Sequence, residues 1–218
     1  MRATVVTIRT TIDKKPHDHT LVIAGDRARS TAEHDVWRLF DTRAKTVTVV
    51  DDVARTVKTE ALAAIVERRE AVNAAALPPH YARAELARTQ ERRELQGVRA
   101  EQVTITAGGY KRELWLAEHP AIPAGLFAML HASETPSSPL APMMRDVDRE
   151  LVAVRGFPLL DRTTVPVGKG ELVVERVVVA ISQRDVPQSM VAIPKGYEDR
   201  TDGRAPAEGL GKGARRKD

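Results

Sequence analysis

The sequence predicts an α+β protein in which a curved antiparallel sheet, an incomplete barrel, is covered by two to three helices. Alternating apolar residues with short, turn-forming connections dominate the first sixty residues, and such connections are too short for parallel crossovers. A helical spacing of apolar residues replaces this alternation twice, and strands follow each helix. The 218 residues, 42% of them hydrophobic, are enough to bury an ordinary core.

The first part of the chain is predicted to form a meander. Apolar Val6, Ile8 and Ile12 alternate with polar side chains, which is the pattern of a strand with one buried face. We expect strands over residues 4–12, 21–24, 27–30, 36–40, 46–50 and 53–58. The polar, proline-bearing residues 14–19 are expected to form the first turn of this meander.

The period of the apolar residues changes after this meander. Leu62, Ile65 and Val66 fall at helical spacing, so the pattern predicts a helix over residues 62–76. Thr59 is the expected N-cap of this helix. Two consecutive prolines follow the segment and end the helix, because proline lacks the amide proton and clashes with the preceding turn.

Strands return in the second half of the chain. We expect them over residues 84–88, 94–95, 101–106, 110–117, 161–167, 172–181 and 189–193. Gly108 and Gly109 predict the turn of a hairpin, since both tolerate positive φ. A short apolar helix is expected over residues 126–132, and an amphipathic one over residues 140–154 that Gly156 ends.

The chain is expected to form one domain over residues 1–198. Residues 199–218 contain no Val, Ile or aromatic residue and are rich in Gly, Ala and charged residues. Such a segment buries too little apolar surface to offset the entropy lost on ordering, so we expect a disordered tail.

Composition and charge exclude several classes of protein. With no cysteine, the chain has no disulfide, no thiolate nucleophile and no Cys-ligated metal. The net charge is +4, but acidic and basic residues alternate, as in residues 67–70, so we expect no nucleic acid partner. No apolar run approaches the ~18 residues of a membrane-spanning helix. Aromatic residues make up only 4%, too few for a sugar-stacking cleft or a base-stacking surface.

Residue types used in catalysis lack the spacing that catalysis needs. None of the serines lies in a nucleophile-elbow pattern, and the glycines at 168 and 170 lack phosphate-binding spacing. His17 and His19 lie on the same side of an extended segment and can chelate a divalent ion, but the spacing specifies no third ligand. We therefore expect no enzyme, no cofactor and no specific metal site.

An antiparallel sheet with one apolar face must cover that face. If the expected helices pack tightly against it, the core is filled. If the sheet curves strongly, a gap between sheet and helices becomes an aliphatic cavity suited to an acyl chain. Met129, Met143 and Met144 fall in the helices, where such flexible side chains either adapt to an apolar ligand or simply fill the core.

Several sequence phrases point to one known group of proteins. They are Ile-Ala-Gly-Asp-Arg-Ala-Arg at 23–29, the strand–Asp–turn–strand segment 39–51, Leu-Gln-Gly-Val at 95–98 with the Trp115 strand, and Ala-Ile-Pro-Lys-Gly-Tyr at 192–197. Over about residues 3–198 the chain resembles a family of domains of unknown function with the outer-membrane lipoprotein carrier (LolA/LolB-like) fold. Val98 departs from the tyrosine of relatives that carry the Gly-Tyr phrase.

The resemblance implies an incomplete barrel around a hydrophobic cavity and a periplasmic or cell-envelope location. The N-terminus itself carries no signal-peptide pattern, so the sequence fits either a cytosolic protein or an exported one in its mature form. The resemblance transfers no catalytic motif.

The sequence thus predicts non-catalytic binding of an apolar ligand such as an acyl chain, a lipid or a lipoprotein, with an envelope protein as a further candidate partner. The candidate lining is Leu39, Val47, Val49, Ile65, Trp115, Met143 and Met144. The alternative is a structural or protein-interaction module with a filled core and an exposed sheet edge or apolar patch. A hydrolase would need a polar cluster at a cleft, which the sequence does not predict.

Overall fold

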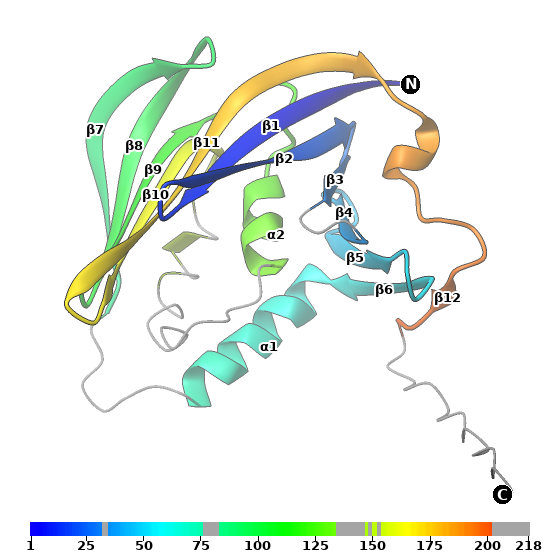
Figure 1. The fold of residues 1–218 in the computed structure, drawn as a ribbon, viewed down its shortest axis with the longest axis horizontal. Helices are drawn as coiled ribbons and strands as arrows, with labels where there is room; N and C mark the ends of the chain where they lie inside the picture. The colour runs from blue at the N-terminus through cyan, green and yellow to red at the C-terminus, as the bar shows by residue number, and fades with distance from the viewer. Residues whose placement is uncertain (32–34, 76–82, 134–146, 148–149, 152–153, 202–218) are drawn as a thin grey trace, which may run out of the picture.

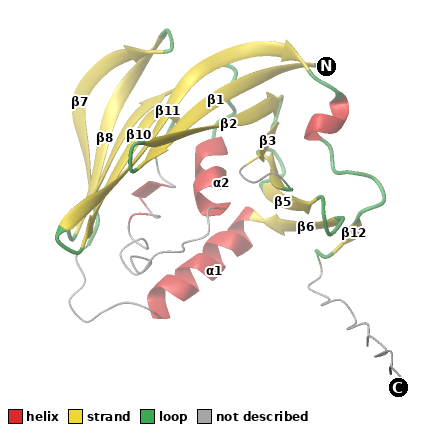
Figure 2. Ribbon diagram, viewed as in Figure 1, coloured by secondary structure: helices red, strands yellow, loops and turns green. Residues whose placement is uncertain are grey.

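The structure is a computed structural model that describes residues 1–31, 35–75, 83–133, 147, 150–151 and 154–201. One strongly curved sheet arches over two helices and does not close into a barrel (Figures 1 and 2). We call the side toward the helices the inner face and the opposite side the outer face. The expected α+β class with a curved, antiparallel, incompletely closed sheet is confirmed.

The strands and helices have the following bounds. The strands are β1 (Arg2–Ile12), β2 (Lys15–Ala24), β3 (Arg27–Thr31), β4 (Val36–Asp41), β5 (Thr46–Asp51), β6 (Thr56–Ala61), β7 (Glu85–Leu95), β8 (Val98–Ala107), β9 (Tyr110–Ala117), β10 (Phe157–Val167), β11 (Gly170–Asp185) and β12 (Glu198–Asp199). The helices are α1 (Leu62–Ala75), α2 (Leu126–Ser133) and the 3-10 turn η1 (Gln188–Val191).

The sheet consists of two meanders joined side by side. Its strand order is β12-β6-β5-β4-β3-β2-β1-β11-β10-β9-β8-β7, so β1 pairs with both β2 and β11. Each neighbouring pair is antiparallel except β12 with β6, which is parallel. Helix α1 connects the two meanders, and α2 lies in the connection from β9 to β10.

One of the two expected turns is confirmed, and the first hairpin requires a correction. The Gly108–Gly109 hairpin and strand β9 occur as predicted. Residues 14–19 do not form a turn, because Asp13 and Lys14 alone reverse the chain with φ of 48° and 64°. Positive φ at both central residues is the geometry of a two-residue hairpin turn. Strand β2 therefore begins at Lys15 and includes His17 and His19.

Three further expectations at element boundaries are wrong. Thr59 lies inside β6 and does not cap α1. The strand expected from residue 53 starts at Thr56, because the carboxylate of Asp51 accepts a hydrogen bond from the amide of Ala54 at 2.7 Å and stabilises a longer turn. Residues 189–193, expected as a strand, include most of η1, whose Val191 is buried.

Some expectations fall largely on residues outside the described ranges. Of the helix expected over 140–154, Val147, Glu150 and Leu151 are described and helical. Gly156 follows with φ of 96°, and a Cβ there would lie 3.1 Å from the carbonyl oxygen of Ala117, so the position requires glycine. Residues 202–218 of the expected tail, like Met143 and Met144, lie outside the described residues, whereas Asp199 belongs to β12.

The buried apolar residues form two clusters on opposite faces of the sheet. The main cluster fills the space between the inner face and the helices, where Val6 and Phe40 from the sheet join Leu126 from α2. A smaller outer cluster contains Trp37, Leu39, Val50, Val57 and Val191. Residues 186–201, which we call the C-terminal strap, cross the outer face and close this second cluster (Figure 1).

Candidate functional site

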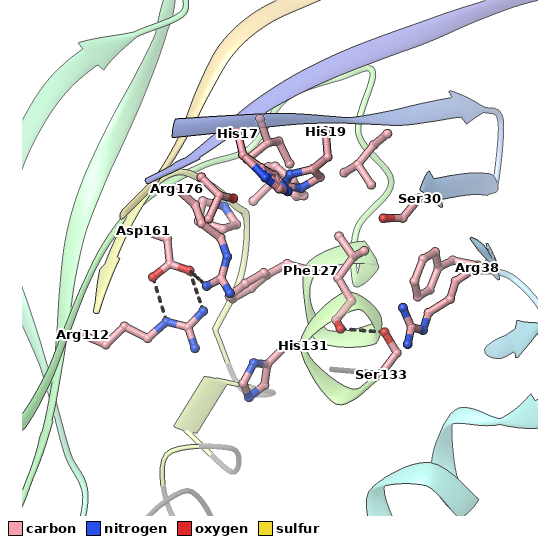
Figure 3. Close-up of a pocket in the computed structure, with 17 residues that line it drawn as sticks. His17, His19, Ser30, Arg38, Arg112, Phe127, His131, Ser133, Asp161 and Arg176 are labelled. Atoms are coloured by element: carbon pink, nitrogen blue, oxygen red, sulfur yellow. Dashed lines mark hydrogen bonds and ion pairs between the residues drawn. The ribbon is translucent and has the colours of Figure 1, made fainter. Parts of the chain in front are cut away.

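A pocket of about 250 Å³ lies between the inner face of the sheet and α2 (Figure 3). Strands β1–β4 form one wall of the pocket. Strands β9–β11, including Phe157 and Pro158 at the start of β10, form another, and α2 closes the third side. Its lining is Ile8, Thr10, His17, His19, Leu21, Ser30, Arg38, Phe40, Arg112, Phe127, Leu130, His131, Ser133, Phe157, Pro158, Asp161 and Arg176.

The deep part of the pocket is apolar. Leu21 on β2 and Phe40 on β4 are only 1% and 0% exposed. Phe127 and Leu130 face them from α2. The alternation of side chains along a strand places these sheet residues on the inner face together, so the apolar wall follows directly from the strand pattern.

A buried ion pair forms the polar end of the pocket. The guanidinium of Arg112 on β9 donates two hydrogen bonds to the carboxylate of Asp161 on β10, at 2.9 and 2.6 Å, and both side chains are 5% exposed. Arg176 on β11 reaches the same carboxylate at 3.4 Å. Burial by itself raises the pKa of Asp161, but the charge and hydrogen bonds of Arg112, with the charge of Arg176, hold this pKa below its usual value.

His17 and His19 enter the pocket because β2 is extended at these positions. Their rings lie 6.4 Å apart, centroid to centroid, on the inner face. Alternation sends Asp18 to the outer face, where its carboxylate pairs with Arg9 at 2.8 and 2.9 Å. The prediction that the imidazoles of His17 and His19 lie on the same side of an extended segment is confirmed. Asp18 projects from the opposite side and does not join them as a candidate metal ligand.

Helix α2 is fixed in place by α1. The buried guanidinium of Arg69 on α1 donates to the carbonyl oxygens of His131 and Ala132, at 3.1 and 3.3 Å. The last carbonyls of a helix have no partner within it, so a cation at this end stabilises the helix. Arg69 thereby connects the C-terminal end of α2, which lines the pocket, to α1.

The lining predicted from the sequence lies elsewhere in the structure. Val47 and Ile65 belong to the main cluster, and Trp115 packs against it with the guanidinium of Arg93 3.8 Å from its ring centroid. Leu39 belongs to the outer cluster, and Val49 is half-buried on β5. These five residues are not among those that line the pocket, and Met143 and Met144 lie outside the described residues.

The polar lining residues were not predicted from the sequence as a site. Arg112 and Asp161 are 49 positions apart, and no local pattern relates them. The sequence did contain one signal, at Arg38. This residue lies between the apolar Trp37 and Leu39 in a predicted strand, so its side chain must project from the opposite face of the strand. The sequence alone does not tell which of the two faces borders a pocket.

Chemically, the pocket offers apolar contact surface together with guanidinium and imidazole groups. The only carboxylate among its described lining residues, Asp161, already accepts hydrogen bonds from Arg112 and Arg176. Within the described part of the chain, no helix is long and apolar enough to cross a membrane.

Fold and pocket together define an α+β protein whose open, curved antiparallel sheet forms a pocket with a short helix. The chain belongs to the family described as "Domain of unknown function (DUF4412)", which matches residues 4–197. This confirms the resemblance to a family of domains of unknown function. No curated protein sequence matches the chain significantly.

Two solved structures align with most of this chain, both with TM-scores below 0.5. PNGF-II has 11% sequence identity and a TM-score of 0.49, over 91% of this chain and 30% of that one. The Pseudomonas aeruginosa MucA/MucB complex has 13% identity and a TM-score of 0.40, over 89% of this chain and 56% of that one. The chain thus spans less than a third of the length of PNGF-II.

Proposed function

We propose that the protein binds an apolar ligand, such as an acyl chain, a lipid or the acyl chains of a lipoprotein, in the pocket between the sheet and α2. The observation that carries this proposal is the pocket of about 250 Å³ whose deep wall consists of Leu21, Phe40, Phe127 and Leu130. An apolar wall of this kind favours ligands that gain by leaving water.

The size of the pocket limits what enters it. Ligand pockets usually have at least ~300 Å³, so about 250 Å³ suits a short chain or one end of a longer one. Burying roughly 200 Å² of apolar ligand surface would contribute about 5 kcal/mol at ~25 cal/mol per Å², before the entropic cost of association. The expected affinity is therefore modest.

The proposal includes the lipoprotein-carrier-like arrangement and a periplasmic or envelope location. Its support is the set of sequence phrases over residues 3–198, together with an open, curved sheet that is covered by helices on one face only. A carrier of this kind takes up an apolar group from one partner and releases it to another, without chemistry on the ligand.

The ligand proposal is tested by native mass spectrometry of protein purified from bacterial cells, combined with titration of 1-decanol. We expect an added mass that organic extraction removes, and saturable decanol binding. Ser30→Phe places a ring in the pocket from β3 and abolishes both, whereas Thr20→Phe, on the outer face of β2, leaves both unchanged. A wild-type protein with no adduct and no saturable binding would overturn the proposal.

The alternative function, an interaction module that adds a partner strand to the sheet, has weaker support. Strand β7 is an edge of the sheet and is exposed along nearly its whole length. It carries charged residues at Arg88 and at 91–94, and its pairing with β8 is interrupted between Arg88 and Arg92. Charges and bulges on an edge strand discourage the addition of another strand, so the pocket is the better candidate.

A further inference from the structure

Cationic and imidazole side chains line the pocket on more than one side: Arg176 lies beside Asp161, the two histidines project from β2, and Arg38 lies on the opposite flank near Ser133 (Figure 3). We call His17, His19, Arg38 and Arg176 the basic rim (Figure 3). They come from β2, β4 and β11 and are brought together only by the fold. Apolar binding alone gives no reason for such a rim, because burying cations beside an apolar wall costs desolvation free energy.

Strand register places these side chains on the inner face in separate rows across the strands. His17 pairs with Thr10, and Thr10 pairs in turn with Arg176 on the other side of β1. On the opposite flank, Leu21 pairs with Ser30 and Ser30 with Arg38. Neighbouring strands are about 4.8 Å apart, so the backbone of each arginine lies roughly 10 Å from β2. Arg176 is level with His17, whereas Arg38 is level with Leu21, further along β2.

Exposure differs between the basic rim and the apolar wall beside it, although Arg112, His131 and Asp161 are buried as deeply as that wall. His17 is exposed, while His19, Arg38 and Arg176 are half-buried. Leu21 and Phe40, which border them in the same pocket, are buried. The basic rim is therefore at the solvent side and the apolar wall lies deeper, the arrangement that matches a ligand with a polar head and an apolar chain.

The charges of the lining are unbalanced. Among the described lining residues there are three arginines, Arg38, Arg112 and Arg176, against one carboxylate, Asp161. Asp161 is held between Arg112 and Arg176, and Arg38 forms no ion pair with any described residue. A guanidinium at a pocket mouth recognises carboxylate and phosphate groups by paired N–H donors.

We propose that the pocket takes an anionic amphiphile, with its carboxylate or phosphate head at Arg38 and its apolar chain against Leu21 and Phe40, while His17 and His19 line the neighbouring part of the mouth. This inference rests on the proposed function and adds the chemical class of the ligand and the direction in which it lies. Arg176, oriented by Asp161, contributes to the same rim.

The experiment compares three probes that share one alkyl chain. Decanoate, decyl phosphate and uncharged 1-decanol are titrated into the full chain below their micelle concentrations, at low and at high salt. We expect decanoate or decyl phosphate to bind at least tenfold more tightly than decanol, because hydrogen bonds to a charged group are strong. Added salt reduces this preference.

Two variants identify the source of the preference. Arg38→Gln removes one charge from the basic rim, and we expect it to bring the affinity for the anionic probe within about threefold of that for decanol. Arg9→Gln removes the same charge from the outer face of β1, close in sequence to Ile8 and Thr10, and is expected to keep the full preference. Circular dichroism of both variants shows that they are folded.

The outcomes separate the two proposals. Preference for both anions, or for either one, supports the inference, and the better probe distinguishes a fatty acid from a phospholipid-type head. Equal binding of all three probes by the wild type overturns the basic rim as a head site while leaving apolar binding intact. A preference that Arg9→Gln abolishes and Arg38→Gln does not also overturns it. Absence of binding by decanol and by both anions overturns the proposed function itself.

Discussion

The two faces of the sheet bury apolar residues in different ways. On the outer face, the strap closes a small cluster around Trp37 and Leu39 with Val191. Two of its polar groups are paired with one carboxylate, since Asp52 accepts hydrogen bonds from the Trp37 indole at 3.1 Å and from the Tyr197 hydroxyl at 3.0 Å. On the inner face, the eight-residue helix α2 covers the sheet and leaves a pocket beside it. The strap closes the outer cluster with Val191 of its 3-10 turn η1, whereas α2 leaves a pocket beside it.

Two arginines on neighbouring strands illustrate the difference. Arg29 on β3 stacks on the Trp37 ring, 3.9 Å from its centroid, and burial lowers its pKa while Asp52 partly opposes this. Arg38 on β4 projects to the inner face and lines the pocket. The same residue type thus serves the fold on one face and is available to a ligand on the other.

The largest effect is expected from the buried ion pair of the inner face. Asp161→Asn leaves the guanidinium of Arg112 buried without its counter-charge, and this should reduce the free energy of unfolding by about 4 kcal/mol in urea denaturation at pH 7. The double variant Arg112→Met/Asp161→Leu should recover most of the loss. Asp18→Asn, which breaks the exposed outer-face pair with Arg9, should cost far less. Equal losses in Asp161→Asn and Asp18→Asn would contradict this account.

The outer cluster should be structural only. Leu39→Ala removes a side chain that is 4% exposed, so we expect a loss of about 3 kcal/mol of unfolding free energy from the cavity it leaves. Affinity for decanol should stay at the wild-type value, because Leu39 faces the strap. If the folded Leu39→Ala variant binds decanol clearly less tightly than the wild type, Leu39 contributes to the ligand site, as the sequence analysis predicted.

The pH dependence of the unfolding free energy should arise in part from Asp161 on the inner face. The folded-state pKa of Asp161 is lower than its unfolded value. Its charged form therefore stabilises the fold above the unfolded pKa of about 4, and this contribution is lost as the pH falls through the folded-state pKa. Unfolding free energy measured from neutral to acidic pH should fall less steeply in Asp161→Asn than in the wild type. Parallel curves would show that this carboxylate is not responsible.

The smallest effect is expected at the strap. Tyr197→Phe removes the hydroxyl that donates to Asp52, a hydrogen bond that also raises the pKa of Tyr197. Because the ring stays in place, we expect a slight change in stability and somewhat faster hydrogen exchange in β12 and η1. Faster exchange in α2 instead would show that the two faces are coupled.

The sequence predicted the elements better than it predicted the site. Gly108 and Gly109 specify their hairpin by backbone conformation, which is a local property, so β8 and β9 could be placed. Strand β4 was ambiguous, because Trp37 and Leu39 are buried on the outer face and Phe40 on the inner one. Alternation does not tell the two faces apart when both are covered.

The polar site depends on long-range pairing, which a single sequence does not contain. His17 and His19 were expected at a hairpin tip, and the two-residue turn at Asp13 and Lys14 moved them into the sheet. Arg176 meets Asp161 because β10 pairs with β11, and Arg176 lies near His17 only because β1 lies between them.

The central claim, that the inner face binds a ligand and the outer face does not, is tested most directly by methyl NMR during titration with decanoate. We predict saturable chemical-shift changes at Ile8, Leu21 and Leu130, and none at Leu39, Val50 and Val191. Shifts confined to the outer cluster, or no saturable shifts at all, would contradict the account.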